Sequence, residues 1–159
     1  MSLPPLHSTL VEPDVADPQA SVLELDELWS FVLKKTCKRW IWVAQCRATR
    51  QVVAYVIGDR SEATCRKLWE QIPHAYRAAH CYSDFWEAYH RVIPDEQHTA
   101  CGKDSGQRAR VERWNNTLRQ RLGRFVRKTL SFSKGETMHE ICLRLFLHEY
   151  NGSLALSPD

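Results

Sequence analysis

The sequence lacks the features that mark membrane and exported proteins. No stretch of its 159 residues reaches the roughly 18 consecutive apolar residues that a membrane span requires. Residues 1–20 contain no basic segment followed by an apolar core, so no signal peptide is predicted. The chain also contains no internal repeat and no low-complexity tract. We therefore expect a protein that is neither exported nor bound to a membrane.

Closely spaced cysteines are missing as well. The six cysteines, at positions 37, 46, 65, 81, 101 and 142, are spread along the chain without a C-x-x-C pair. Small disulfide scaffolds and zinc fingers need denser or paired cysteines. His80, Cys81, His98 and Cys101 fall in one third of the chain, but their spacings match no common zinc pattern. We predict reduced, mostly buried thiols.

The chain has little net charge, and its value of +3 indicates a polyanionic partner only weakly. With 43% hydrophobic residues it can bury one substantial core, but it is short for two domains. Pro4, Pro5, Pro13 and Pro18 interrupt any regular period near the N-terminus. We predict a tail or linker at residues 1–20, one domain at residues 21–152 and a C-terminal tail at residues 153–159.

Hydrophobic periodicity predicts an α/β fold. Residues 22–32, 39–46 and 51–57 are rich in aliphatic, β-branched and aromatic residues, and the polar links between them predict an antiparallel three-strand meander. A helix from an N-cap at Ser61 to Ile72 follows. The remaining predicted elements are a strand at 78–82, a helix at 85–92, a strand at 97–101 and helices at 107–122 and 136–150.

The aromatic residues include six tryptophans, at positions 29, 40, 42, 69, 86 and 114. Exposed tryptophans could stack on unpaired nucleic-acid bases. Most of these six lie on strand or helix stripes that a core would use. We therefore expect most of them to pack in the core.

Asp26 stands in the middle of an otherwise apolar predicted strand. Burying a lone carboxylate is costly unless it is paired or binds a cation. The alternative is an edge strand with one solvated face, because Glu24, Asp26 and Ser30 share the parity opposite to Leu23 and Leu25. From this strand alone, the alternative is favoured.

Two further carboxylates follow. Asp84 lies where a short predicted strand ends and a helix begins, so it could simply cap that helix. Glu112 is the one acidic residue between Arg108 and Lys128, so it could belong to a solvated basic helix face. Each residue taken singly has this plainer interpretation.

The combination of the three carboxylates favours a catalytic interpretation. A carboxylate within the first strand of a meander, a second at the end of the next strand and a third on a later helix is the layout of a ribonuclease-H-like core. Such a set can hold two divalent cations roughly 3.5–4 Å apart, the arrangement that phosphodiester transfer uses. All-oxygen ligands suit Mg²⁺ or Mn²⁺. We predict catalytic and metal-binding roles for Asp26, Asp84 and Glu112.

The residues around Glu112 are strongly basic. Arginines that flank a metal site can hold the DNA backbone through contacts that are independent of base sequence and sensitive to salt. The predicted DNA-binding residues are Arg108, Arg110, Arg113, Asn116, Arg119, Arg121, Arg124, Arg127 and Lys128.

Three blocks of the sequence, LDELWSFV, YSDFWEAY and VERWNNTLRQRLGRFVRKTLSFSK, resemble the catalytic half of transposases of the first insertion-sequence family. The resemblance runs from about residue 23 to residue 151, and its last block is the most specific. It implies a ribonuclease-H-like fold, with the family's acidic triad on Asp26, Asp84 and Glu112 and its basic signature on Asn116 and the basic residues from Arg119 to Lys128. Glu27 is expected to be a bystander, because neighbouring strand residues point to opposite faces.

The resemblance also implies a reaction and its partners. Hydrolysis at the transposon ends exposes a 3′ hydroxyl, which then attacks target DNA. Full-length enzymes of this kind resemble a fusion with an upstream DNA-recognition region, so a separate or fused N-terminal partner is expected. A homo-oligomer on DNA is also expected. The protein is expected in the cytoplasm of a prokaryote, associated with the nucleoid. The alternatives are a ribonuclease-H-like nuclease without joining activity and a non-catalytic DNA-binding relic or regulator.

Overall fold

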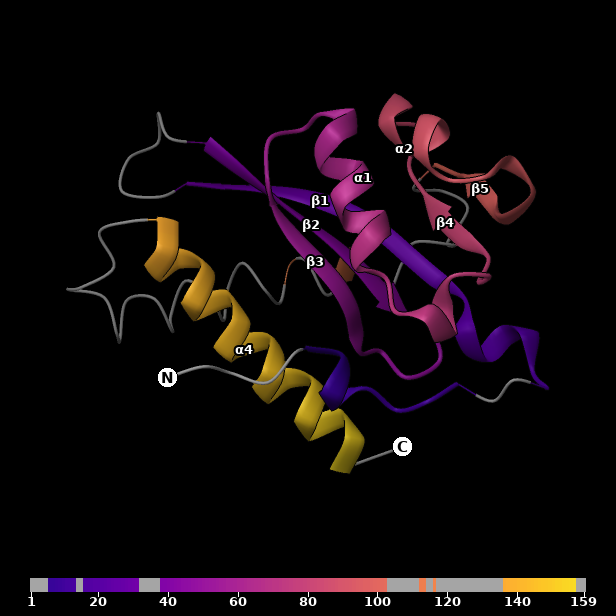
Figure 1. Ribbon diagram of the computed structural model, residues 1–159, viewed down its shortest axis with the longest axis horizontal. Helices are drawn as coiled ribbons and strands as arrows, with labels where there is room; N and C mark the ends of the chain where they lie inside the picture. Colours follow the sequence, from indigo (N-terminus) through magenta and orange to yellow (C-terminus); the bar gives the residue numbers. More distant parts are fainter. Residues whose placement is uncertain are drawn as a thin grey trace.

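The computed structural model describes residues 6–13, 16–31, 38–102, 112–113, 116 and 136–156. At its centre is a five-stranded mixed sheet (Figure 1). The strands are β1 (Leu23–Phe31), β2 (Lys38–Cys46), β3 (Val52–Gly58), β4 (Cys81–Ser83) and β5 (His98–Ala100). Their spatial order is β3-β2-β1-β4-β5, which places β1 in the middle.

Helices cover both faces of the sheet (Figure 1). Helices α1 (Glu62–Gln71) and α2 (Glu87–Val92) lie together on one face, and α4 (Glu136–Leu156) crosses the other. Four short 3-10 helices occupy Leu6–Thr9, Pro18–Ser21, His74–Tyr76 and Asp95–Gln97. Although α4 has 21 residues, no helix in the described part of the chain is long and apolar enough to cross a membrane.

The strand pairing confirms the predicted meander and excludes one interpretation of Asp26. Strand β1 pairs antiparallel with β2, and β2 with β3, whereas β1–β4 and β4–β5 are parallel. Because β1 has a neighbour on each side, it is not an edge strand. Glu24, which shares the parity of Asp26, is buried. Asp26 therefore lies on a covered central strand, and the alternative of a solvated edge is wrong.

The core has two layers separated by the sheet. On the side of α1 and α2, Leu23, Leu25 and Trp42 pack with residues of both helices. On the side of α4, Ile41 and Val43 pack against Leu143, Phe146 and Leu147. The alternation of side chains along each strand divides the apolar residues between these layers. Both faces of β2 are therefore buried from Ile41 to Cys46.

Most element boundaries agree with the sequence predictions. Ser61 caps α1 as predicted, because its side chain accepts a hydrogen bond from the Thr64 backbone N–H. Strand β4 starts three residues later than predicted, because a 3-10 helix and a turn occupy residues 74–79. Helix α4 runs six residues past its predicted end. The predicted helix at 107–122 lies outside the described residues except at 112, 113 and 116, which are helical.

Polar side chains attach the N-terminal segment and α4 to β3. The Gln51 amide donates to the backbone carbonyls of Thr9 and Asn151, at 2.9 and 3.0 Å. The Asn151 side chain accepts from the Val52 N–H and donates to the Val52 carbonyl. Part of the predicted tail, residues 6–13, therefore contacts the domain, and residues 153–156 continue α4. The domain boundaries stay a prediction.

The predicted burial of cysteine and tryptophan side chains is confirmed where the structure describes them. Cys46, Cys65, Cys81 and Cys101 are free thiols in buried positions. Trp42 is completely buried, while Trp40, Trp69 and Trp86 are partly buried against the same layer.

Candidate functional site

Asp26 projects from the middle of β1. Its cross-strand neighbour on β2 is Val43, a residue of the core layer beneath α4. One carboxylate oxygen, Oδ1, accepts a hydrogen bond from the Glu27 backbone N–H at 2.9 Å. The backbone of β1 therefore helps to set the direction of this half-buried carboxylate.

Asp84 follows directly after β4, and the parallel register brings it level with Asp26. Leu23 pairs with Cys81 and Glu24 with Tyr82, so two residues further on Asp26 stands beside Asp84. The Asp84 Oδ1 accepts from the Trp86 N–H at 2.9 Å, a turn just before α2. The N-cap of α2 is Trp86, and no side chain caps this helix, so the interpretation of Asp84 as a helix cap is wrong.

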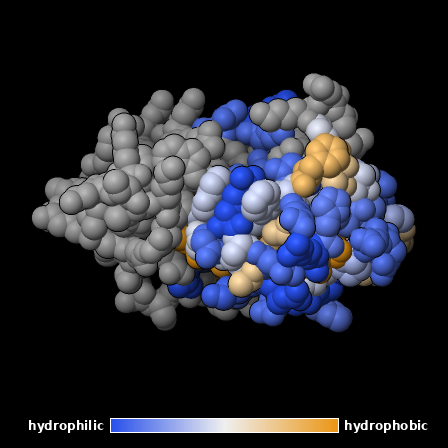
Figure 2. All heavy atoms as spheres, turned by 90° about the horizontal axis from the view of Figure 1, so that it is seen from above, coloured by the Kyte–Doolittle hydropathy of each residue, from blue (hydrophilic) through white to orange (hydrophobic). Residues whose placement is uncertain are grey.

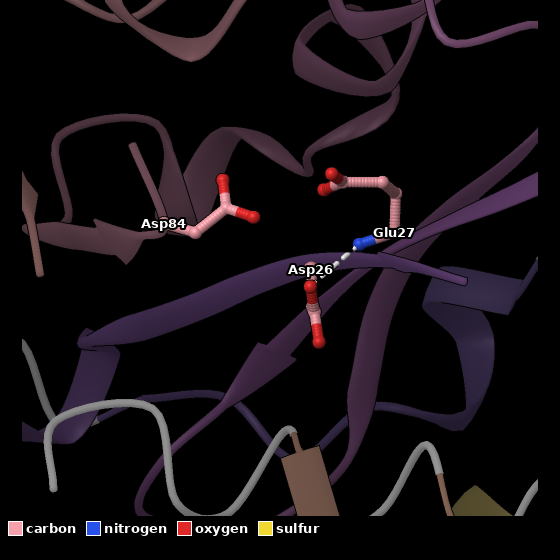
Figure 3. Close-up of side chains that lie close together, drawn as sticks. All are labelled: Asp26, Glu27 and Asp84. Carbon is pink, nitrogen blue, oxygen red and sulfur yellow. Dashed lines mark hydrogen bonds between the residues drawn. The ribbon is translucent and has the colours of Figure 1, made fainter. Parts of the chain in front are cut away.

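Glu27 joins these two carboxylates. One oxygen from each of Asp26, Glu27 and Asp84 lies within 4.8 Å of the others. As expected, Asp26 and Glu27 point to opposite faces of β1, but the Asp84 carboxylate points toward Glu27 (Figure 3). Glu27 therefore lies beside Asp84, because β4 ends close enough for Asp84 to approach from the Glu27 side, and the bystander role of Glu27 stays a prediction.

The Glu27 carboxylate is buried and held by two partners. The Arg60 guanidinium donates to Oε1 from Nε and Nη2, at 3.1 and 2.8 Å, and the Tyr89 hydroxyl donates to Oε2 at 2.5 Å. Burial raises the pKa of Glu27 above its ordinary value; the Tyr89 hydrogen bond opposes this rise, and the negative charge of Asp84 adds to it. Carboxylates this close repel one another, and a bound cation would offset the repulsion.

The sequence did contain a signal for Glu27. Leu23 and Leu25 share its parity on β1 and are buried in the layer beneath α1 and α2. A carboxylate that continues this apolar stripe needs a partner or a cation. Arg60 gives no such signal, because it lies 33 residues away and reaches Glu27 only through the fold.

The third predicted carboxylate lies outside this group. Glu112 is half-buried in a helical segment, and it is not among the three carboxylates that converge. Arg113 and Asn116 are helical and exposed. The other predicted DNA-binding residues lie outside the described residues: Arg108, Arg110, Arg119, Arg121, Arg124, Arg127 and Lys128.

The cluster can hold a metal ion, and its donors are oxygen atoms throughout. Carboxylate oxygens suit hard divalent cations such as Mg²⁺ and Mn²⁺. Among the described His, Cys, Asp and Glu residues no second group converges, and the ligand atoms of His80, Cys81, His98 and Cys101 are not gathered in this structure. Instead, His98 contacts the Ser83 hydroxyl and the Cys101 thiol donates to the Ser83 carbonyl.

His98, next to the Asp84 loop, is expected to make stability depend on pH. Burial, followed by repulsion from His90 and His80, lowers the pKa of His98, while Asp95 raises it. The folded state therefore takes up fewer protons than the unfolded chain, and stability falls as the pH drops below about 6.5. We expect the Tm to decline between pH 7 and 5, and less steeply in His98→Gln. A calorimetric series with exposed His74→Gln as control checks this; equal declines in both variants would contradict it.

One face of the described part of the molecule is mostly polar (Figure 2). Figure 2 shows a largely hydrophilic face in the described part of the molecule, with small hydrophobic patches. Among the described large hydrophobic residues, Val11 and Phe85 are exposed, and Phe85 has 67% of its surface accessible. Phe85 directly follows Asp84 in the chain, so an exposed aromatic residue adjoins one of the three carboxylate residues in sequence.

Comparison with known proteins identifies the family. The model of the family described as IS1 transposase matches residues 20–151. The iso-IS1n protein InsB of Shigella dysenteriae is 38% identical over 131 residues, covering 82% of this chain and 97% of that protein. The IS1 protein InsB of Shigella flexneri is 34% identical, covering 79% and 92%. The chain therefore belongs to the IS1 transposase family, and its function is that of an insertion-sequence transposase.

Proposed function

We propose that this transposase cuts and joins DNA at a metal site built from Asp26 and Asp84, with Glu112 as the third ligand. Water attacks the phosphodiester at the transposon end and releases a 3′ hydroxyl. That hydroxyl then attacks a phosphodiester of target DNA, forming one bond to phosphorus as another breaks. Both steps use the same carboxylates.

One observation carries this proposal. A carboxylate from the middle of the central strand and a carboxylate from the end of the adjacent parallel strand have oxygens within 4.8 Å of each other. The parallel register sets these two aspartates side by side, although their like charges repel. A shared cation accounts for their proximity, because it offsets the repulsion between them.

The arrangement of strands supports a ribonuclease-H-like fold. An antiparallel meander of β1, β2 and β3 followed by parallel β4 and β5 gives a mixed sheet with helices on both faces. In this proposal residues 21–152 form the catalytic domain. Glu112 reaches the cluster from its helix when DNA and metal bind.

The expected cofactor is a pair of Mg²⁺ or Mn²⁺ ions. When bound, such ions lower the pKa of the attacking water and neutralise charge on the phosphate. The carboxylate oxygens of Asp26 and Asp84 fit these cations. The carboxylates would hold the ions in position and so fix where the phosphodiester can lie.

DNA is the proposed substrate and main partner. The basic residues around Glu112 would contact the phosphate backbone, and exposed Phe85 offers a ring on which a base near the cut can stack. We further propose a homo-oligomer that holds two transposon ends, and a separate or fused N-terminal protein that recognises their sequence.

The proposal is tested by metal dependence. The purified chain is incubated with a labelled pre-cut transposon end and a supercoiled plasmid, in Mg²⁺, Mn²⁺ or EDTA. We expect joined product with either metal, none with EDTA, and recovery when Mn²⁺ is added in excess. Nicking without joining would favour the nuclease alternative. DNA binding without any cleavage would favour a non-catalytic regulator.

A further inference from the structure

We propose that Glu27, Arg60 and Trp86 form a positioning clamp that holds the carboxylates of Asp26 and Asp84 at the separation a metal ion requires. The inference rests on the proposed function, since it concerns the same carboxylates. It adds three residues that do not themselves need to touch metal or DNA. The clamp is a continuous chain of contacts from β1 to the loop after β4.

The first link lies on β1. The Glu27 backbone N–H donates to the Asp26 Oδ1, so the direction of Asp26 depends on the position of Glu27. The Glu27 side chain, 1% exposed, receives both hydrogen bonds of Arg60 on Oε1 and that of Tyr89 on Oε2. Both of its oxygens therefore have a protein donor.

The second link is the Arg60 guanidinium, which lies near two indole rings. Its central carbon is 4.8 Å from the centre of the Trp40 ring and 4.1 Å from that of Trp86. The planar guanidinium can stack on aromatic faces while its edge donates to a carboxylate, and a lysine ammonium cannot do both. Arg60 thus connects the Glu27 carboxylate to the Trp86 side chain.

The third link is Trp86 itself. Its backbone N–H donates to the Asp84 Oδ1 at 2.9 Å. Asp26 is therefore held by the backbone of one clamp residue, Glu27, and Asp84 by the backbone of another, Trp86. The side chains of these two residues meet through Arg60.

Stability alone does not explain a carboxylate at position 27. The preceding residues on this face of β1, Leu23 and Leu25, are apolar and buried. A buried ion pair is often no more stabilising than apolar residues of similar size. Residues that orient metal ligands typically change metal affinity by about 10–100-fold when mutated, which matches the position of this clamp.

The experiment measures Mn²⁺ binding to the full chain by electron paramagnetic resonance, without depending on activity. For Glu27→Gln we expect Mn²⁺ affinity about tenfold weaker than wild type. The matched control is Glu24→Gln, the same substitution at an equally buried, arginine-paired glutamate of β1. Glu24 pairs with Arg47 rather than Arg60, so its Mn²⁺ affinity should equal that of wild type.

A second variant separates positioning from charge. Arg60→Lys keeps the positive charge but loses the planar fork, so we expect it to weaken Mn²⁺ binding as much as Glu27→Gln does. Wild-type affinity in Arg60→Lys would overturn the clamp. So would equal affinities in Glu27→Gln and Glu24→Gln.

Asp84→Asn in the same series distinguishes failure of the metal site from failure of the clamp. If Mn²⁺ binding survives Asp84→Asn, the metal site is wrongly assigned and the proposed function fails with it. If binding is lost in Asp84→Asn but unchanged in Glu27→Gln, the metal site stands and only the clamp is rejected.

Discussion

Replacing Asp84 by asparagine is expected to reduce strand transfer by about a thousandfold or more. Asparagine keeps the shape of the side chain and can still accept the Trp86 hydrogen bond through its amide oxygen. It removes the negative charge that a divalent cation needs. Metal stabilisation of the transition state is worth several kcal/mol, and ~4 kcal/mol corresponds to about a thousandfold in rate. Timed joining of a pre-cut end to plasmid DNA measures the effect.

The same substitution should not destabilise the protein. The nearby carboxylates of Asp84 and Glu27 repel each other in the folded state, and this repulsion raises the pKa of Glu27. Removing the Asp84 charge relieves the repulsion, so in the absence of metal we expect a Tm equal to or above that of wild type. Loss of activity together with unchanged or higher stability is the pattern of a functional residue.

Glu87→Gln is the control for Asp84→Asn. Glu87 lies three residues further on, is exposed, and pairs with Arg91 on the surface of α2. Glu87→Gln makes the same change of charge near the same loop as Asp84→Asn does. It should leave strand transfer at the wild-type rate. Equal loss in both variants would indicate a general charge effect, and full activity of Asp84→Asn would reject the assignment of Asp84.

The fold was predictable where local pattern decides structure. The meander follows from three β-branched and aromatic segments separated by short polar links, and α1 follows from Ser61 and the Pro73 stop. The start of β4 was not predictable. The periodicity assigns Ala79 to a strand, but its N–H instead donates to the Tyr76 carbonyl and closes a turn. The Gln97 side chain also donates to the Arg77 and Ala79 carbonyls, so tertiary contacts support the turn over a weak local strand preference.

The candidate site was predictable only in part, because some of its contacts are set by the fold and not by local sequence pattern. Asp26 and Asp84 stand out as carboxylates within or after apolar segments, and a parallel strand order brings such residues together. Glu27 was correctly predicted to point to the face of β1 opposite to Asp26. The sequence did not indicate that Asp84 approaches from that face. The contact with Arg60 depends on the register of three strands and the position of the β3–α1 loop, which no local pattern specifies.

The indole beneath this site should carry much of the stability of the domain. Trp42 is completely buried, sits opposite Glu27 on β2, and packs edge-on against Tyr89 with 5.4 Å between ring centres. Its Nε1 donates to the Asp59 carbonyl. We expect Trp42→Ala to lower the free energy of unfolding by about 3–5 kcal/mol, a large part of the roughly 5–15 kcal/mol typical of a domain. Urea unfolding followed by circular dichroism measures this.

Trp69→Ala provides the comparison, because Trp69 is only half-buried at the margin of the same layer. The central carbon of the Arg77 guanidinium lies 5.8 Å from the centre of the Trp69 ring. It should cost less than half as much as Trp42→Ala, since less apolar surface returns to water and no enclosed cavity remains. Equal losses would mean that Trp42 is not the centre of the layer. Because Trp42 also supports Tyr89, whose hydroxyl holds Glu27, the Trp42→Ala protein that remains folded should bind Mn²⁺ more weakly, whereas the Trp69→Ala protein should not.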